Sequence, residues 1–266
     1  MEKKNQIYFL VLLILILFTI NYPYLNSMVE RSLSGDRVVN VTRVIVTRVI
    51  DGDTIEIETG EHIRLLGINT PEKGEEYSNE AKEFLEGEIL GREVELVFGR
   101  DKYDKYKRIL AYVYLGNENV NQEIVEAGFA NYYFPSGKDN YYEDFRSAWK
   151  NCLNKKINLC EKSEDICADC IELKKFDYKS EILVFYNKCS FDCDLTNWGI
   201  KDEGRKHFSF EDFILEAGKK VEVKVGEGGN TQSEIFWGRE DYVWTDSGDT
   251  MFLRDDKNKL VLWKSY

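Results

Sequence analysis

Two segments of the chain carry side chains that could act on phosphate esters. Residues 51–54 read Asp-Gly-Asp-Thr, so two carboxylates flank a glycine between two apolar runs. Acidic residues and glycine at such a place usually form only a turn. Residues 64–72 begin with Arg64 inside an apolar run and end with Glu72. A guanidinium among apolar neighbours is costly without an anionic partner, so Arg64 predicts one nearby.

A third segment adds a second arginine. Residues 104–108 read Asp-Lys-Tyr-Lys-Arg and precede another apolar run. Taken alone, these residues predict only a charged hairpin tip, and Glu72 taken alone predicts only a solvated charge in a loop. Together the three segments supply oxygen ligands for a hard cation, one carboxylate base and two planar guanidinium groups. This set meets the needs of phosphodiester hydrolysis, in which charge builds on the phosphoryl oxygens.

The pattern around these segments predicts a small barrel with helices attached to it. Val and Ile dominate the first apolar run, and turn residues separate the later ones. We expect strands at residues 38–50, 54–58, 62–68, 93–98 and 109–115. We expect helices at residues 78–89, capped by Ser78 or Asn79 and ended by Gly91, at 120–127, and from about 141. Five strands with appended helices are typical of an OB-type barrel.

The same segments resemble a known family. VIDGDT at residues 49–54, RLLGINTPE at 64–72 and DKYKR at 104–108 occur in the order found in thermonucleases of the staphylococcal-nuclease type, and a matching helix begins at Val120-Asn121. The resemblance extends over about residues 41–159. It implies a five-stranded OB barrel, dependence on calcium, and cleavage of DNA or RNA, with single-stranded or unpaired nucleic acid as the expected substrate.

The resemblance implies a metal site. Asp53, Asn69 and the carbonyl of Thr70 would hold one calcium ion, which takes several oxygen ligands and leaves room for water and a phosphate oxygen. The family usually has an aspartate where this chain has Asn69. A neutral carbonyl oxygen in place of a carboxylate predicts weaker calcium binding.

The resemblance also implies three catalytic groups. Glu72 would act as general base on a water that attacks phosphorus in line, with no covalent intermediate. Arg64 and Arg108 would hydrogen-bond the phosphoryl oxygens in the transition state. The family commonly has glycine before the second arginine, where this chain has Lys107, so a turn that favours positive φ carries a side chain here.

The last third of the chain reads as a second, all-strand domain. Short strands are expected at residues 182–187, 199–201, 208–210, 220–225, 235–237, 250–254 and 260–263, as in an immunoglobulin-like sandwich. DLTNW at 194–198, FILEAGK at 213–219 and DSGDT at 246–250 are similar to a lamin-tail domain, over about residues 179–266. We expect Trp198 and Trp237 in its core. The whole chain is therefore predicted to be mainly β with helices (α+β), and the partner of this domain is unknown.

Six cysteines follow the predicted barrel, at positions 152, 160, 167, 170, 189 and 193. Residues 160–178 are polar and cysteine-rich and predict a linker between a nuclease-like domain at 38–159 and the second domain at 179–266. Disulfides are the main interpretation, and a structural zinc held by the first four cysteines is the alternative. Six cysteines allow 15 pairings, so the sequence assigns none.

The N-terminus predicts export. Lys3 and Lys4 precede residues 7–20, a run of 14 residues without charge. This run is shorter than the about 20 residues that cross a bilayer and matches the core of a signal peptide. No clean Ala-x-Ala cleavage site follows, so residues 1–30 are either a signal peptide or a retained membrane anchor. Either way we expect an extracytoplasmic protein, secreted or anchored to the membrane.

Charge leaves a rival interpretation open. The chain has a formal net charge of −12, and residues 41–150 hold 14 Lys and Arg against 22 Asp and Glu. This sign excludes the broad basic surface of a protein that grips duplex DNA. It favours the alternative of a catalytically weak surface module that binds nucleic acid or protein. A disulfide-stapled structural surface protein is a third possibility, which explains the cysteines but not the three segments. The presence of all three of Arg64, Glu72 and Arg108 favours an enzyme.

Overall fold

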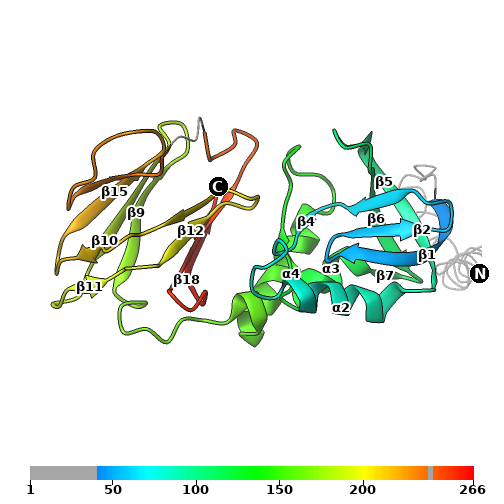
Figure 1. Cartoon of the computed structure of the whole chain (residues 1–266), viewed down its shortest axis with the longest axis horizontal. Coiled ribbons are helices and arrows are strands. Elements are labelled where there is room, and N and C mark those ends of the chain that lie inside the picture. The colour runs from blue at the N-terminus through cyan, green and yellow to red at the C-terminus, as the bar shows by residue number, and fades with distance from the viewer. Residues whose placement is uncertain (1–40, 239–241) are drawn as a thin grey trace, which may run out of the picture. The chain divides into compact units, whose positions relative to one another are not determined.

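The computed structural model describes residues 41–238 and 242–266 (Figure 1). Residues Val41–Tyr266 form one compact unit. The predicted signal peptide or anchor, residues 1–30, lies outside the described residues. Within the described part of the chain, no helix is both long and apolar enough to span a membrane.

Five strands close into a barrel, which confirms the predicted fold class. The strands pair in the order β3-β2-β1-β5-β6, and a parallel pairing of β3 with β6 joins the two ends. Their bounds are β1 (Val41–Asp51), β2 (Thr54–Ile57), β3 (His62–Leu65), β5 (Glu93–Tyr103) and β6 (Ile109–Leu115), with β7 (Glu118–Asn119) beside β6. Two shorter strands, β4 (Ile68–Asn69) and β8 (Asn131–Tyr132), pair outside the barrel. We call the region from β1 to η1 (Asn158–Cys160) the barrel domain.

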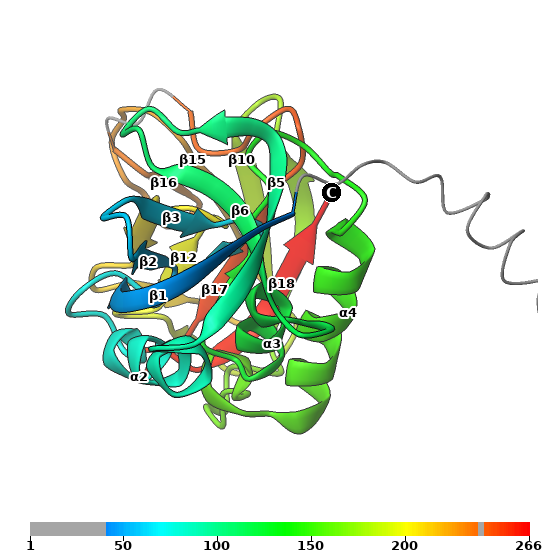
Figure 2. The same ribbon diagram turned by 90° about the vertical axis from the view of Figure 1, so that its right-hand side faces the viewer.

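Three α-helices of the described chain belong to the barrel domain, and α3 lies between α2 and α4 (Figure 2). They are α2 (Ser78–Ile89), α3 (Val120–Glu126) and α4 (Tyr142–Lys155). The predicted caps of α2 are wrong, because Ser78 already lies in the first turn and Tyr77 precedes it at a φ of 67° without a side-chain cap. The predicted stop at Gly91 is consistent with its φ of 73°.

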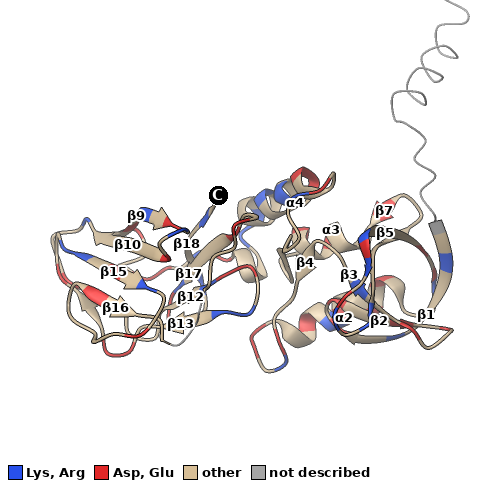
Figure 3. Cartoon of the chain, turned by 90° about the horizontal axis from the view of Figure 1, so that it is seen from above, with Lys and Arg blue, Asp and Glu red and all other residues tan. Residues whose placement is uncertain are grey.

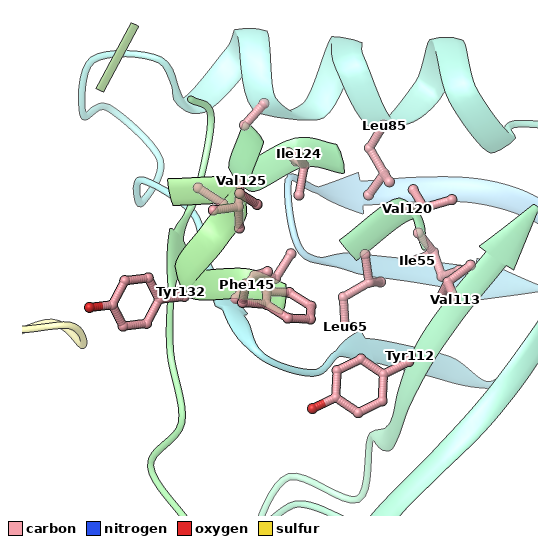
Figure 4. Packing of buried hydrophobic residues seen from close by; sticks show 14 of the residues in the cluster. Ile55, Leu65, Leu85, Tyr112, Val113, Val120, Ile124, Val125, Tyr132 and Phe145 are labelled. Carbon is pink, nitrogen blue, oxygen red and sulfur yellow. The ribbon is translucent and has the colours of Figure 1, made fainter. Parts of the chain in front are cut away.

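Apolar side chains from the helices and from alternate strand positions meet in one core. Figure 4 shows Leu85 of α2, Ile124 of α3 and Phe145 of α4 directed toward Ile55 and Leu65 of the barrel strands. All five are fully buried. Burial on this scale supplies the main driving force for folding. The core therefore holds the strand ends that carry the motifs in fixed positions.

The second part of the chain is a β-sandwich, as predicted. One sheet has the order β16-β15-β10-β9 and the other β13-β12-β17-β18. Their bounds are β9 (Ile171–Asp177), β10 (Ile182–Asn187), β15 (Lys220–Lys224), β16 (Glu234–Phe236), β12 (Gly199–Lys201), β13 (His207–Ser209), β17 (Thr250–Arg254) and β18 (Leu260–Ser265), with a small pair β11 (Cys193–Asp194) and β14 (Ile214–Leu215). We call the region from β9 to β18 the sandwich domain. Trp198 and Trp237 are buried in its core, as expected.

Three disulfides use all six cysteines, which leaves none as a zinc ligand. They join Cys152 to Cys160, Cys167 to Cys193 and Cys170 to Cys189. The last two tie the start of the sandwich domain to the segment after β10. Strand β9 lies inside residues 160–178, for which the sequence predicts a linker. The boundaries at residues 38–159, 160–178 and 179–266 remain predictions from the sequence.

The two domains share part of one core. Trp149 of α4 packs edge-on against Phe252 of β17, with ring centroids 5.5 Å apart, and against Trp263 of β18 at 6.4 Å. Arg254 Nη2 donates to the carbonyl of Leu159 at 2.8 Å. Trp149 and Phe252 are buried, so this contact excludes water and fixes one domain against the other.

Candidate active site

The turn between β1 and β2 brings Asp53 to Arg64. Thr54 of β2 lies opposite Arg64 of β3, and Asp53 directly precedes Thr54, so Asp53 lies beside Arg64. Arg64 Nη2 is 2.8 Å from Asp53 Oδ2, and both side chains are only 11% exposed. A Cβ at Gly52 would stand 2.7 Å from Ala81, so only glycine fits this turn. Asp53 is the anionic partner that the apolar surroundings of Arg64 predict.

Residues 69 and 70 complete a buried polar cluster around Asp53. The backbone N–H and the hydroxyl of Thr70 approach Asp53 Oδ2 at 3.4 and 3.3 Å. Asn69 Oδ1 accepts a hydrogen bond from Arg64 Nη2 at 3.3 Å. Asn69 and Thr70 are both buried. The structure thus brings together the three residues predicted to hold a metal, and it places Arg64 among them.

The chemistry of this cluster fits a hard cation. Asp51 Oδ1 accepts from the N–H of Asp53 at 3.0 Å, so the two carboxylates lie close together. Burial, and then the charge of Asp53, raise the pKa of Asp51. A bound cation would relieve that repulsion, and carboxylate and carbonyl oxygens are its preferred ligands. The described residues contain no group of three or more His, Cys, Asp or Glu that could hold a metal, so such a site depends on neutral oxygens as well.

Arg108 directly precedes β6, the strand that pairs with β3, and joins the same cluster. Its Nε donates to Asp104 Oδ2 at 2.7 Å, and Nη1 donates to the hydroxyl of Thr54 at 3.3 Å. Thr54 in turn donates to Asp53 Oδ1 at 3.0 Å. Arg64 and Arg108 are therefore connected through Thr54 and Asp53, and the two guanidinium groups face one site.

The turn before Arg108 has the strain that its sequence predicts. Lys107 has a φ of 64°, the left-handed conformation that glycine adopts without cost. Asp104 holds this turn, because its carboxylate accepts from the N–H groups of Tyr106 and Arg108 at 2.8 and 2.9 Å. Burial opposes ionisation of Asp104, but its hydrogen bonds outweigh burial and lower its pKa. The hairpin thereby keeps Arg108 in place despite the missing glycine.

Glu72 lies two residues after Thr70, in an exposed loop that we call the rim of the site. Its side chain is 46% exposed, and its Oε1 is 2.6 Å from Nε of Arg205. The N–H of Glu72 donates to Glu75 Oε2 at 2.8 Å. A general base must reach a water molecule, and this exposure permits it.

Sequence reasoning missed the sandwich-domain residues at this rim. Arg205 contacts Glu72, and the carbonyl of Gly204 accepts from Asn69 Nδ2 at 3.0 Å. Asn69 and Gly204 are 135 positions apart, so no local pattern predicts their contact. The only indication in the sequence is Asn69 itself, because its side-chain amide can donate a hydrogen bond where the family usually has a carboxylate that cannot.

Comparison with known proteins gives two family matches. Residues 62–162 match the model of the staphylococcal nuclease homologues, and residues 168–266 match that of the Lamin Tail Domain. The chain is 35% identical over 127 residues to a thermonuclease of Staphylococcus intermedius, covering 44% of this chain and 76% of that protein. A thermonuclease of Staphylococcus hyicus is 32% identical over 123 residues, with 43% and 73% covered. Endonuclease YncB of Bacillus subtilis is 32% identical over 149 residues, with 50% and 66% covered.

Proposed function

The chain belongs to the family of staphylococcal nuclease homologues, and from that premise we propose that it is an exported, calcium-dependent nuclease that hydrolyses phosphodiester bonds of DNA or RNA. One observation carries the proposal. Arg64 of β3 and Arg108, which directly precedes the neighbouring strand β6, are joined through Asp53 and Thr54 into one network, and Glu72 follows Thr70 of the same cluster by two residues. Such a set can bind a phosphate, stabilise its transition state and activate water.

The two arginines would bind the phosphoryl oxygens. A guanidinium has a planar fork of N–H donors that meets two oxygens at once, which the ammonium of lysine cannot do. Arg64 is held by Asp53 and Arg108 by Asp104, so neither has to be ordered when substrate binds. Preorganised donors stabilise developing charge without a cost of reorganisation at the moment of reaction.

Glu72 would take the proton from the attacking water. Its Oε1 is turned toward Arg205, and its exposed carboxylate can accept a hydrogen bond from water as well. Asp53, Asn69 and Thr70 would hold the calcium ion, with Asp51 close to Asp53. When bound, the ion would polarise the phosphate and orient it for attack.

Export rests on two features of the chain. Three disulfides suit an oxidising compartment outside the cytoplasm. The uncharged run at residues 7–20 provides a signal peptide or a membrane anchor. We propose a secreted or membrane-anchored protein on these grounds.

The chain should cut single-stranded DNA in calcium and stop when calcium is removed. Residues 38–266 would be incubated with a labelled oligonucleotide in calcium, then in excess chelator, then with calcium restored. We expect cleavage to be lost with the chelator and to return with the ion, because the bound ion would polarise and orient the phosphate in addition to the two guanidinium groups. Magnesium serves as the control ion, since its small octahedral shell suits this mixed oxygen set less well.

Cleavage that persists at full rate in chelator would contradict a metal-dependent site. Binding of the oligonucleotide without any cleavage in calcium would instead support the rival function, a catalytically weak surface module. Parallel assays with RNA of the same sequence would decide which nucleic acid is preferred.

A further inference from the structure

The turn between β12 and β13, residues 202–206, brings basic side chains of the sandwich domain to the loop that carries Glu72. Arg205 Nε lies 2.6 Å from Glu72 Oε1. Lys201, the last residue of β12, binds Glu75 through Nζ at 3.0 Å. Figure 3 shows the basic stretch beside β13 in a chain whose other charges are largely interspersed. The sandwich domain therefore contributes directly to the rim of the proposed active site.

Two side-chain amides of the barrel domain, the buried Asn69 and the partly buried Asn131, hold the backbone of this turn. Asn69 Nδ2 donates to the carbonyl of Gly204 at 3.0 Å, and Asn131 Nδ2 donates to the carbonyl of Glu203 at 3.0 Å. Asn69 and Asn131 are register partners in β4 and β8, so one strand pair presents two N–H donors to successive peptides. A turn held at two adjacent peptide groups keeps Arg205 at the site.

The sandwich side of the turn is equally fixed. The N–H of Glu203 donates to Asp249 Oδ1 at 3.2 Å, and the hydroxyl of Thr250 donates to Glu203 Oε1 at 2.5 Å. The N–H of Lys206 donates to Asp202 Oδ1 at 2.9 Å, which closes the turn. Glu203, Asp249 and Thr250 are all buried. The position of Arg205 is thus determined by both domains.

This contact gives a physical reason for asparagine at position 69. An aspartate there has no side-chain N–H, so one carboxylate oxygen would face the carbonyl oxygen of Gly204 and neither acceptor would have a donor in this contact. Asn69 Oδ1 also accepts from Arg64, so one amide connects the turn to a catalytic arginine. The amide of Asn69 therefore links the proposed metal site to the sandwich domain.

Arg205 is available to a further anion. Its side chain is 65% exposed, and the ion pair with Glu72 uses Nε, while its two Nη groups carry four more donors. Ion pairs as exposed as this one contribute little net stability, so a phosphate can share or replace Glu72 as partner. A cation here also offsets the repulsion between a polyanion and the acidic barrel domain.

We propose, on the basis of the nuclease function above, that the turn 202–206 is part of the active site and that Arg205 binds the phosphate next to the scissile one. Glu72 must contact the attacking water, which lies about 3–3.5 Å from phosphorus. Arg205 approaches Glu72 from the sandwich domain, whereas Arg64 and Arg108, which would meet the scissile phosphate, are held by carboxylates of the barrel domain. Arg205 is thereby placed for the neighbouring phosphate of the strand, and the sandwich domain acts as a substrate-binding element.

The test compares Arg205→Ala and Arg205→Lys with the wild-type chain, each as residues 38–266. Arg43→Ala is the matched control, because Arg43 is 66% exposed and forms an equivalent pair with Glu95 at 2.9 Å, away from the site. Each protein is assayed on a single-stranded oligonucleotide and on a nitrophenyl ester of a nucleoside monophosphate, which has a single phosphodiester. Oligonucleotide binding is also titrated in chelator over a range of salt.

Arg205→Ala should raise KM for the oligonucleotide about tenfold with little change in kcat, as expected from one charge-assisted contact. The single-phosphate substrate should be cleaved with unchanged KM and kcat. The slope of log affinity against log salt should fall in magnitude by about 0.7. Arg205→Lys should recover much of the affinity, and Arg43→Ala should match wild type.

Three results would overturn the proposal. Equal KM and equal salt slopes in wild type and Arg205→Ala would show that Arg205 meets no phosphate. A higher kcat/KM in Arg205→Ala would show that the turn inhibits the site instead. An equal loss of kcat/KM on both substrates would show that Arg205 acts only by positioning Glu72 and does not contact a neighbouring phosphate. If no protein cleaves anything, the nuclease function fails, and the chelator titration still decides whether Arg205 binds the strand.

Discussion

Glu72→Gln should lower kcat for oligonucleotide hydrolysis by about 100- to 10,000-fold, because general-base catalysis contributes on this scale. Gln has nearly the shape of Glu but cannot take a proton from water. Glu72 is 46% exposed, so the substitution buries no unpaired group and the fold should be retained. Substrate affinity in calcium should remain close to that of wild type. The rate is measured by single-turnover cleavage of a labelled strand.

Glu76→Gln is the matched control for this variant. Glu76 lies in the same loop and binds a cation of the sandwich domain, Lys259 Nζ, at 3.4 Å. It belongs to no part of the proposed site, so its loss should leave the rate within about twofold of wild type, as for surface changes away from functional features. If Glu72→Gln and Glu76→Gln cleave at the same rate, Glu72 is not the base.

Arg64→Ala should have the second largest effect, through both catalysis and stability. Removing a preorganised donor to the transition state costs about 100- to 1,000-fold in kcat. Asp53 would also lose its partner at 2.8 Å in a setting where each side chain is only 11% exposed. Breaking a largely buried ion pair costs about 3 kcal/mol. Chemical denaturation and single-turnover cleavage measure the two effects separately.

Arg64→Lys keeps the prediction testable if the alanine variant unfolds. Lysine retains a charge for Asp53, so most of the stability should remain. It lacks the planar fork, so kcat should still fall by at least about tenfold. A lysine variant with wild-type kcat would show that Arg64 only neutralises Asp53 and does not meet the phosphate.

The strands could be predicted because their signal is local. Residues 109–115 coincide with β6, since an unbroken apolar run ends at Gly116 and is bounded by charge on the other side. The side chain of Arg64, alone among apolar neighbours, correctly indicated a nearby acid. These inferences need only the residues within one or two turns of the chain.

Other features depend on contacts that the sequence does not reveal. Strand β9 was missed because adjacent lysines and nearby cysteines surround it, and because a register shift between Leu173 and Lys175 breaks the alternation that Ile171 and Leu173 begin. The caps of α2 were misplaced because Tyr77 enters the helix in a left-handed conformation, which tertiary packing imposes on a residue that does not favour it.

The rim of the site belongs to this second class. Arg205 reaches Glu72 because the two domains are held together, by the packing of Trp149 on Phe252 and by the hydrogen bonds of Asn69 and Asn131 to the turn. Contacts between the domains therefore decide which charges, far apart in the sequence, meet in the folded chain. The asparagine at position 69 was visible as a departure, but its partner became visible only in the folded structure.

Direct attack by water is the step on which the proposed function depends most. It can be measured as the stereochemical course at phosphorus. The substrate is a phosphodiester in which one phosphoryl oxygen is replaced by sulfur, and the water carries a heavy oxygen isotope. A single in-line displacement by water activated by Glu72 predicts inversion of configuration in the wild-type chain. Retention would require two displacements and a covalent intermediate on the protein, and it would contradict the roles proposed for Glu72, Arg64 and Arg108.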